Sequence, residues 1–173
     1  MKTSDAGIKL IKHFEGVRNK PYRDCIGLWT VGIGHLIGDG KQLPDSYNKT
    51  FTGAEVDALL RKDLGRFERG VAMQLPVPLK QCEFDALVSF SFNLGLGTLQ
   101  RSTLRQAMLR GDKKLAAENI LKYCRAGGKV LKGLQLRRQE EQASLFYQKF
   151  QGLYFLRNLT LLFNYKFDFR MQN

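Results

Sequence analysis

The chain has 173 residues, of which 43% are hydrophobic, and this suffices for one cored domain but hardly for two. Of its net charge of +12, a balance of +10 lies after residue 100, so this part should prefer anionic partners such as nucleic acid, acidic lipid headgroups or the bacterial envelope. The first residues hold no apolar run of signal-peptide length and the three cysteines form no CxxC pair, which argues against a signal peptide, a membrane anchor, a disulfide framework and a structural zinc site.

The amino-terminal region predicts one helix followed by a small β region. Apolar side chains recur every three positions from Ile8 to Phe14. Ser4 or Asp5 can cap the start of this helix, and Gly16 can close its end after residue 15. From residue 22 to about residue 39, short runs separated by glycine-containing turns predict a small antiparallel hairpin or meander.

The remainder of the chain predicts helices. Thr52 and Glu55 have the spacing of a capping box at the start of a long helix, which "PVPL" at residues 76–79 ends. Further helices are predicted over residues 79–93, 102–110, 112–126 and 133–149. The layout is therefore α+β and mostly helical, with a small β lobe, a long connecting helix and a helical lobe.

Two carboxylates near the first helix have contrasting surroundings. Glu15 lies at the carboxyl end of the helix, where the negative end of the helix dipole and apolar neighbours favour the protonated form that a general acid requires. Asp24 lies in the first strand or turn, where polar surroundings should keep it ionised as a base. The alternative for Glu15 is a solvated glutamate at a helix end.

The segment "LWTVGIGH" at residues 28–35 places Thr30 beside two glycines. Alternation puts Thr30, Gly32 and Gly34 on one face of a strand. The glycines indicate either close approach by another molecule, such as a polysaccharide, or a corner or bulge that requires glycine. His35 falls on the apolar face and is predicted to be a structural, hydrogen-bonding histidine; a thiol-protease pair with Cys25 would lack an oriented third group.

These residues resemble the catalytic signature of phage-type lysozymes, glycoside hydrolase family 24, the endolysin muramidases of tailed bacteriophages. The resemblance continues through "FSFNLG" at 90–95, "STL" at 102–104, "AGGKVLKGL" at 126–134 and "RRQEE" at 137–141, and it covers about residues 7–148. It implies a bilobed lysozyme-like fold. The signature, with its characteristic spacing, is fitted at every position by Glu15, Asp24, Thr30, Gly32, Gly34 and His35.

The resemblance implies a peptidoglycan hydrolase that cleaves the β-1,4 bond between N-acetylmuramic acid and N-acetylglucosamine with inversion. It assigns Glu15 as proton donor, Asp24 as the residue that activates or orients a water, and Thr30 as a holder of that water. No metal or organic cofactor is implied. We expect a monomer that is made in the host cytoplasm, passes a holin pore and acts in the periplasm during host lysis.

Weaker matches concern the glycan cleft and the arginines. Leu36, Phe92 and Ser102 match positions that line the cleft in relatives, although each could equally be a core or cap residue. Arg137 or Arg138 matches an arginine that pairs with the catalytic glutamate of the family.

The sequence departs from the family pattern after about residue 148. We therefore divide it into a catalytic domain, residues 1–148, and a basic, aromatic and aliphatic tail, residues 149–173. The tail either folds back on the helical lobe or inserts at an anionic interface such as lipopolysaccharide or a membrane surface. The alternation in "NYKFDFRM" favours a strand over a membrane helix.

Two other functions compete with a hydrolase. A nucleic-acid-binding module would need exposed aromatics interleaved with basic residues, whereas Phe146 and Tyr147 belong to a helix expected to pack. A catalytically silent wall-binding or membrane-disrupting protein would lack one of Glu15, Asp24 and Thr30. The sequence thus predicts an enzyme and no nucleic-acid partner.

Overall fold

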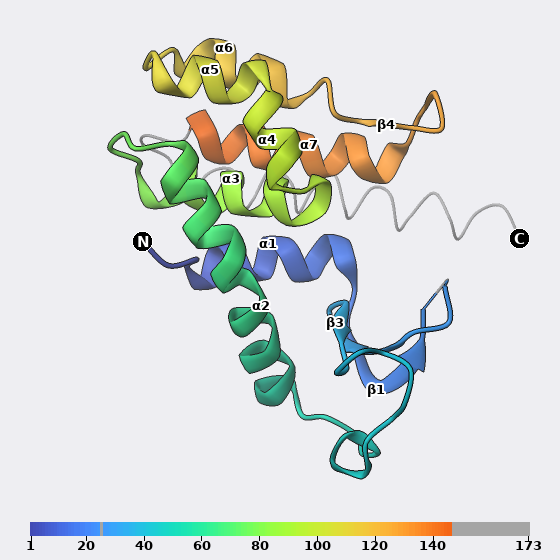
Figure 1. Ribbon diagram of the computed structural model, residues 1–173. Coiled ribbons are helices and arrows are strands. Elements are labelled where there is room, and N and C mark those ends of the chain that lie inside the picture. Colours follow the sequence, from blue (N-terminus) through green and yellow to red (C-terminus); the bar gives the residue numbers. More distant parts are fainter. Residues whose placement is uncertain (25, 147–173) are drawn as a thin grey trace, which may run out of the picture.

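A long helix joins a small β lobe to a larger helical lobe in the computed structural model, which describes residues 1–24 and 26–146 (Figure 1). The predicted α+β, mostly helical layout is confirmed. The predicted tail and the boundary at residue 148 lie outside the described residues. Within those residues, no helix is both long and apolar enough to cross a membrane.

The first helix, α1 (Asp5–Glu15), has the bounds that its caps predict. The Ser4 side chain accepts the backbone N–H of Gly7, and Gly16 ends the helix with a φ of 75°. Glu15 is consequently the last helical residue, directly before the chain enters the β lobe.

The β lobe is a three-stranded antiparallel sheet of β1 (Arg18–Arg23), β2 (Trp29–Gly32) and β3 (His35–Leu36), with β2 in the centre. Thr30 pairs with Tyr22 of β1 and with Leu36 of β3. A 3-10 turn, η1 (Asp45–Tyr47), follows before the long helix begins.

The two glycines of the hairpin form a tight turn against the long helix. Gly32 and Gly34 have φ values of 69° and 71°, and a Cβ atom on Gly32 would lie 3.3 Å from Cγ1 of Val56. Gly32 therefore lies at a corner that requires glycine, with Val56 of the long helix packed against it. Because β2 ends at Gly32, the predicted alternation does not continue to Gly34, and Thr30 is buried, with only 5% of its surface exposed.

The long helix α2 (Gly53–Gln74) starts with the predicted capping box of Thr52 and Glu55. It leads to α3 (Gln81–Leu94), whose residues 83–91 are all buried. Such a helix must be covered on every side, and α1, α2, α4 (Leu96–Arg101) and α7 (Lys132–Phe146) pack around it. Two further helices, α5 (Thr103–Leu109) and α6 (Lys113–Ile120), pack against each other, and α6 also packs on α7.

One helix prediction in this lobe is wrong in part, and one short helix was missed. The helix predicted over residues 112–126 ends at Ile120, and a short hairpin of β4 (Arg125–Ala126) and β5 (Lys129–Val130) follows. Gly127 and Gly128 form its turn with φ values of 55° and 77°. The short helix α4 was not predicted.

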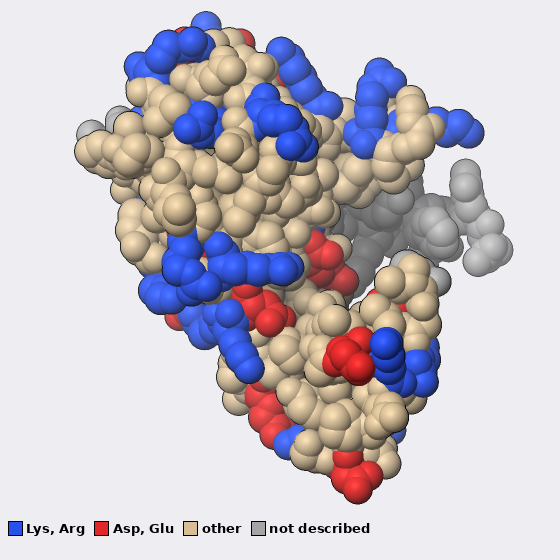
Figure 2. Space-filling model, viewed as in Figure 1, with Lys and Arg blue, Asp and Glu red and all other residues tan. Residues whose placement is uncertain are grey.

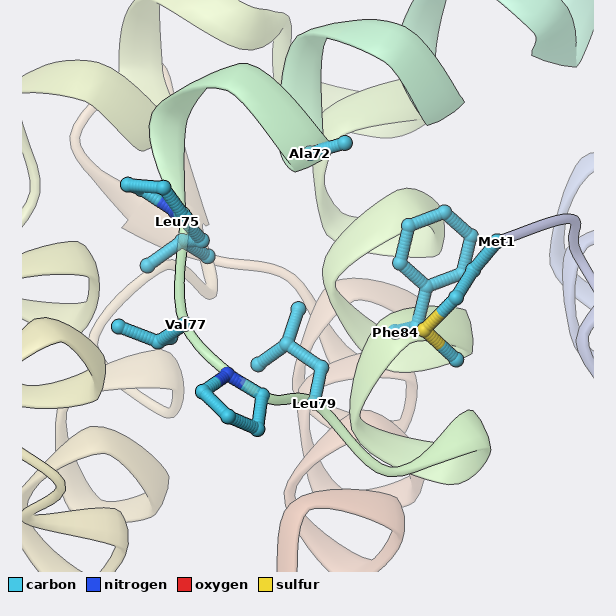
Figure 3. A pocket seen from close by; sticks show the side chains of 8 residues that line it. Met1, Ala72, Leu75, Val77, Leu79 and Phe84 are labelled. Atoms are coloured by element: carbon cyan, nitrogen blue, oxygen red, sulfur yellow. The ribbon is translucent and has the colours of Figure 1, made fainter.

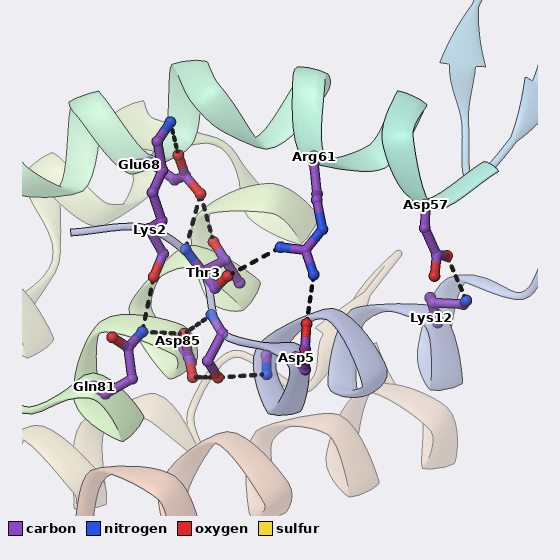
Figure 4. Close-up of polar contacts among 11 residues, drawn as sticks. Lys2, Thr3, Asp5, Lys12, Asp57, Arg61, Glu68, Gln81 and Asp85 are labelled. Atoms are coloured by element: carbon purple, nitrogen blue, oxygen red, sulfur yellow. Dashed lines mark hydrogen bonds and ion pairs between the residues drawn. The ribbon is translucent and has the colours of Figure 1, made fainter. Parts of the chain in front are cut away.

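Buried carboxylates hold the amino-terminal segment against α2 and α3 (Figure 4). Glu68 of α2 accepts the backbone N–H of Thr3 at 2.9 Å, its hydroxyl at 3.0 Å and the ammonium of Lys2 at 2.8 Å. Asp85 of α3 accepts the backbone N–H of Ser4 at 2.9 Å and also its hydroxyl. This clamp fixes the start of α1 and thereby the helix that carries Glu15.

We expect Glu68→Gln to lower the free energy of unfolding by about 1–2 kcal/mol near neutral pH, since it weakens charge-assisted hydrogen bonds. Burial raises the pKa of Glu68, but the hydrogen bonds from Lys2 and Thr3 outweigh it and hold this pKa below its usual value. A lowered folded-state pKa contributes stability above the unfolded value, and this stability is lost as pH falls through the folded value. The difference from wild type in urea unfolding should therefore shrink below about pH 4.

The exposed Glu118 of α6 supplies the control for this measurement. Glu118→Gln should leave unfolding unchanged at both pH values. If Glu68→Gln lowers the free energy of unfolding by the same amount in acid as at neutral pH, the charge of Glu68 does not stabilise its contacts with Lys2 and Thr3.

Candidate active site

Glu15 is held by a buried arginine of the helical lobe. Its side chain is 29% exposed, and Oε1 accepts Nη1 of Arg137 at 2.5 Å. Arg137 is only 2% exposed and lies 5.7 Å from the ring centroid of Phe14. Of the two arginines that the sequence left open, Arg137 is thus the one that pairs with Glu15.

A buried polar network orients Arg137 from behind. Its Nη2 donates to the Ser89 carbonyl at 3.1 Å, and its Nε donates to Oε1 of Glu141 at 3.2 Å. Glu141 also accepts the hydroxyl of Ser89 at 2.7 Å. Ser89 and Glu141 were not among the predicted site residues; the four-residue spacing of Arg137 and Glu141 on one helix was the available signal.

Arg138 faces the same network and does not contact Glu15. It is 0% exposed, and its Nη2 donates to Oδ1 of Asn93 at 2.9 Å and to Oε1 of Glu141 at 3.2 Å. Burial lowers the pKa of Arg138, and the charge of Glu141 opposes this shift. Burial likewise raises the pKa of Glu141, against the charges of both arginines.

Asp24 lies in the turn between β1 and β2. Its Oδ1 accepts the backbone N–H groups of Ile26 at 3.0 Å and Leu28 at 2.8 Å, and its own N–H donates to the Leu28 carbonyl at 2.9 Å. Within residues 1–24 and 26–146, no group hydrogen-bonds Oδ2. This turn therefore fixes the carboxylate through Oδ1.

Thr30 meets the same turn. Its hydroxyl donates to the carbonyl of Leu28 at 3.3 Å, so Asp24 and Thr30 share Leu28 as a partner. Glu15, in contrast, is tied to α7 of the helical lobe. The three predicted catalytic residues therefore lie on both sides of the junction between the lobes.

His35 connects the β lobe to the long helix. Its Nδ1 lies 2.8 Å from Oδ2 of Asp63 on α2, and its ring stacks on Tyr47 with a centroid distance of 6.4 Å. These contacts agree with the predicted structural, hydrogen-bonding histidine. Cys25 lies outside the described residues.

The three predicted cleft residues differ in accessibility. Leu36 is 43% exposed, whereas Phe92 is half-buried. The Phe92 ring packs edge-on against Phe67, with the two ring centroids 5.3 Å apart. Ser102 is 1% exposed, and its hydroxyl donates to the Leu99 carbonyl at 2.7 Å while it caps α5. Ser102 thus has the contacts of a cap residue; a role of these residues in glycan binding stays a prediction.

On the face drawn in Figure 2, Lys and Arg side chains gather over the helical lobe. A separate apolar pocket of about 310 Å³ lies beside the carboxyl end of α2 (Figure 3). It has none of the acidic or basic side chains that hydrolysis requires, because its lining consists of Met1, Ala72, Leu75, Pro76, Val77, Pro78, Leu79 and Phe84.

The sequence matches the profile of the family described as phage lysozyme over residues 12–141. The chain belongs to the phage lysozyme family. It is 41% identical to the endolysin of Bacillus phage B103 over 144 residues, which are 82% of this chain and 53% of that protein. The SAR-endolysin of bacteriophage PS119 is 41% identical over 128 residues, 74% of each chain. The chain thus spans about half the length of the Bacillus phage relatives.

Solved structures confirm the lysozyme-like fold. P22 lysozyme superposes with a TM-score of 0.76 at 31% identity, over 85% of this chain and 99% of the other. The muramidase domain of SpmX from Asticaccaulis excentricus superposes with a TM-score of 0.74 at 32% identity, again over 85% and 99% of the two chains. The bilobed architecture predicted from the motif is therefore correct.

Proposed function

We propose that this phage lysozyme family member is an endolysin that hydrolyses the β-1,4 bond between N-acetylmuramic acid and N-acetylglucosamine in peptidoglycan during host lysis. The observation that carries this proposal is the pairing of Glu15 with the buried Arg137, beside a hairpin that holds Asp24 and Thr30 at the family spacing. A carboxyl group on the helical lobe and a carboxylate on the β lobe are the two groups that glycoside hydrolysis needs.

In the proposed reaction Glu15 donates its proton to the glycosidic oxygen as the bond from that oxygen to the anomeric carbon breaks. A water attacks the anomeric carbon from the opposite face, and Asp24 accepts its proton, so the configuration is inverted. Oδ1 of Asp24 is held by two backbone N–H groups, which leaves Oδ2 for the water. Thr30 helps to hold this water. Arg137 stabilises the Glu15 carboxylate that forms when the proton leaves.

Clearing of a peptidoglycan suspension by the purified protein tests this function. We expect new reducing ends on muramic acid, and early NMR spectra of the products should show the α anomer first. Reducing ends on glucosamine, or a β anomer as the first product, would contradict the proposed bond or the proposed mechanism.

We propose in addition that residues 149–173 bind an anionic surface such as lipopolysaccharide; this proposal rests on sequence alone, because the segment lies outside the described residues. Leucine and aromatic side chains are interspersed there with Arg157, Lys166 and Arg170. A chain that ends at residue 148 should hydrolyse isolated peptidoglycan normally but kill intact Gram-negative cells less well. Equal loss of both activities would show that residues 149–173 are part of the folded core.

A further inference from the structure

Glu141 is a buried carboxylate that shares an arginine with the proposed acid. It is 0% exposed and accepts Nε of Arg137 at 3.2 Å, while Nη1 of the same guanidinium reaches Glu15 at 2.5 Å. The Ser89 carbonyl accepts Nη2 at 3.1 Å. Each nitrogen of the Arg137 guanidinium thus has its own partner. Because Glu141 and Ser89 accept Nε and Nη2, Nη1 is the nitrogen that points to Glu15.

The charges of this cluster balance. Arg137 and Arg138 contribute two positive charges, and Glu15 and Glu141 contribute two negative charges when ionised. Because Arg138 is 0% exposed, its charge acts in a region that water screens poorly. With Glu141 ionised, one net positive charge of the two arginines acts on Glu15; with Glu141 neutral, both arginine charges would act on it and would favour its carboxylate form more strongly.

The other elements around the cluster contribute few charges. Helix α3 adds the neutral side chains of Ser89 and Asn93. His13 of α1 interacts with Glu140 of α7, and the Cys124 thiol after α6 interacts with Arg138. Glu141 is accordingly the carboxylate in contact with both arginines among the described residues.

We propose that Glu141 is a positioning residue for the hydrolysis: it orients the Arg137 guanidinium toward Glu15 and cancels part of the arginine charge that acts on Glu15. This inference rests on the proposed function of Glu15 as general acid. A carboxylate that only filled the core would affect stability but would not set the pH range of catalysis.

The test is the pH dependence of kcat/KM for Glu141→Gln, Arg138→Gln and the double variant. A general acid must be protonated, so its ionisation produces the alkaline limb of the profile. Glu141→Gln should move this limb to lower pH by about 0.5–1 unit, because the net charge behind Glu15 rises by one. Arg138→Gln should move it to higher pH, and the double variant should return it close to the wild-type position.

The opposite shifts and their cancellation exclude a merely structural role. If Glu141→Gln does not fold because a buried arginine is left unbalanced, the comparison of Arg138→Gln with the double variant still measures the effect of Glu141. Glu118→Gln, a change at an exposed position of α6, should not move the limb. Equal loss of activity at every pH, or shifts of the same sign in both single variants, would overturn the inference.

Carbon-13 NMR titration of the Glu15 carboxyl group separates this inference from the proposed function. Shifts of opposite sign in the two single variants would support the charge balance even in a protein that did not clear peptidoglycan. An active wild type whose Glu15 titrates identically in all variants would retain the function and reject the role of Glu141.

Discussion

Glu15→Gln is expected to reduce peptidoglycan hydrolysis by at least about 100-fold, the scale on which general acids contribute to catalysis. Glutamine keeps the size of the side chain and an oxygen that can accept Nη1 of Arg137, but it has no proton to give to the leaving oxygen. The side chain is partly exposed, so the fold should be retained. Initial rates of peptidoglycan clearing, with circular dichroism on the same samples, measure both effects.

Glu140 provides the matched control because it is a second carboxyl group whose charge interacts with α1, through His13. It is half-buried on α7, and burial raises its pKa against the opposing charge of His13. Glu140→Gln should keep most of the activity, since Arg137 contacts Glu15 and not Glu140. A folded Glu15→Gln protein with wild-type rates, or an inactive Glu140→Gln protein, would assign the acid to another residue.

The sequence predicted best where local chemistry decides the structure. Helix α1 begins after Ser4, whose side chain accepts the backbone N–H three residues further on, and it ends before Gly16, which adopts a positive φ. The capping box at Thr52 determines the start of α2 in the same way. The spacing of Glu15, Asp24 and Thr30 belongs to a short continuous segment. Local signals of this kind need no knowledge of the rest of the molecule.

Features that depend on distant segments could not be predicted in this way. A buried Val56 explains Gly32, and the glycine pair at 127–128 forms a hairpin that helical periodicity did not reveal. The support of Arg137 joins α3 to α7 through Ser89, whose carbonyl and hydroxyl both take part. A serine within an apolar helix gives no sign of such a partner 48 residues away.

The proposed catalytic residues of the two lobes are held by different kinds of interaction. On the helical lobe, buried charges of opposite sign orient Glu15 through Arg137. On the β lobe, backbone N–H groups of one turn hold Asp24. Changes in charge should therefore act mainly on Glu15, the proposed acid, and changes in turn geometry mainly on Asp24, the proposed base.

Asp24→Asn is expected to reduce hydrolysis by about 100-fold or more, because an amide cannot take a proton from the attacking water. The amide oxygen can still accept the N–H groups of Ile26 and Leu28, so the turn and its link to Thr30 should be preserved. The loss should appear mainly in kcat, since substrate binding does not require the charge.

Asp39 supplies the control for this change, because its Oδ1 accepts the backbone N–H of Lys41 at 3.0 Å in the same kind of turn. Asp39→Asn should leave both the rate and the thermal unfolding temperature at wild-type values. If Asp24→Asn unfolds at the wild-type temperature and still hydrolyses peptidoglycan at a normal rate, the water must be activated by another group. If it loses activity together with stability, Asp24 acts through the turn. Loss of kcat in a protein of unchanged stability is the result that assigns Asp24 to the water.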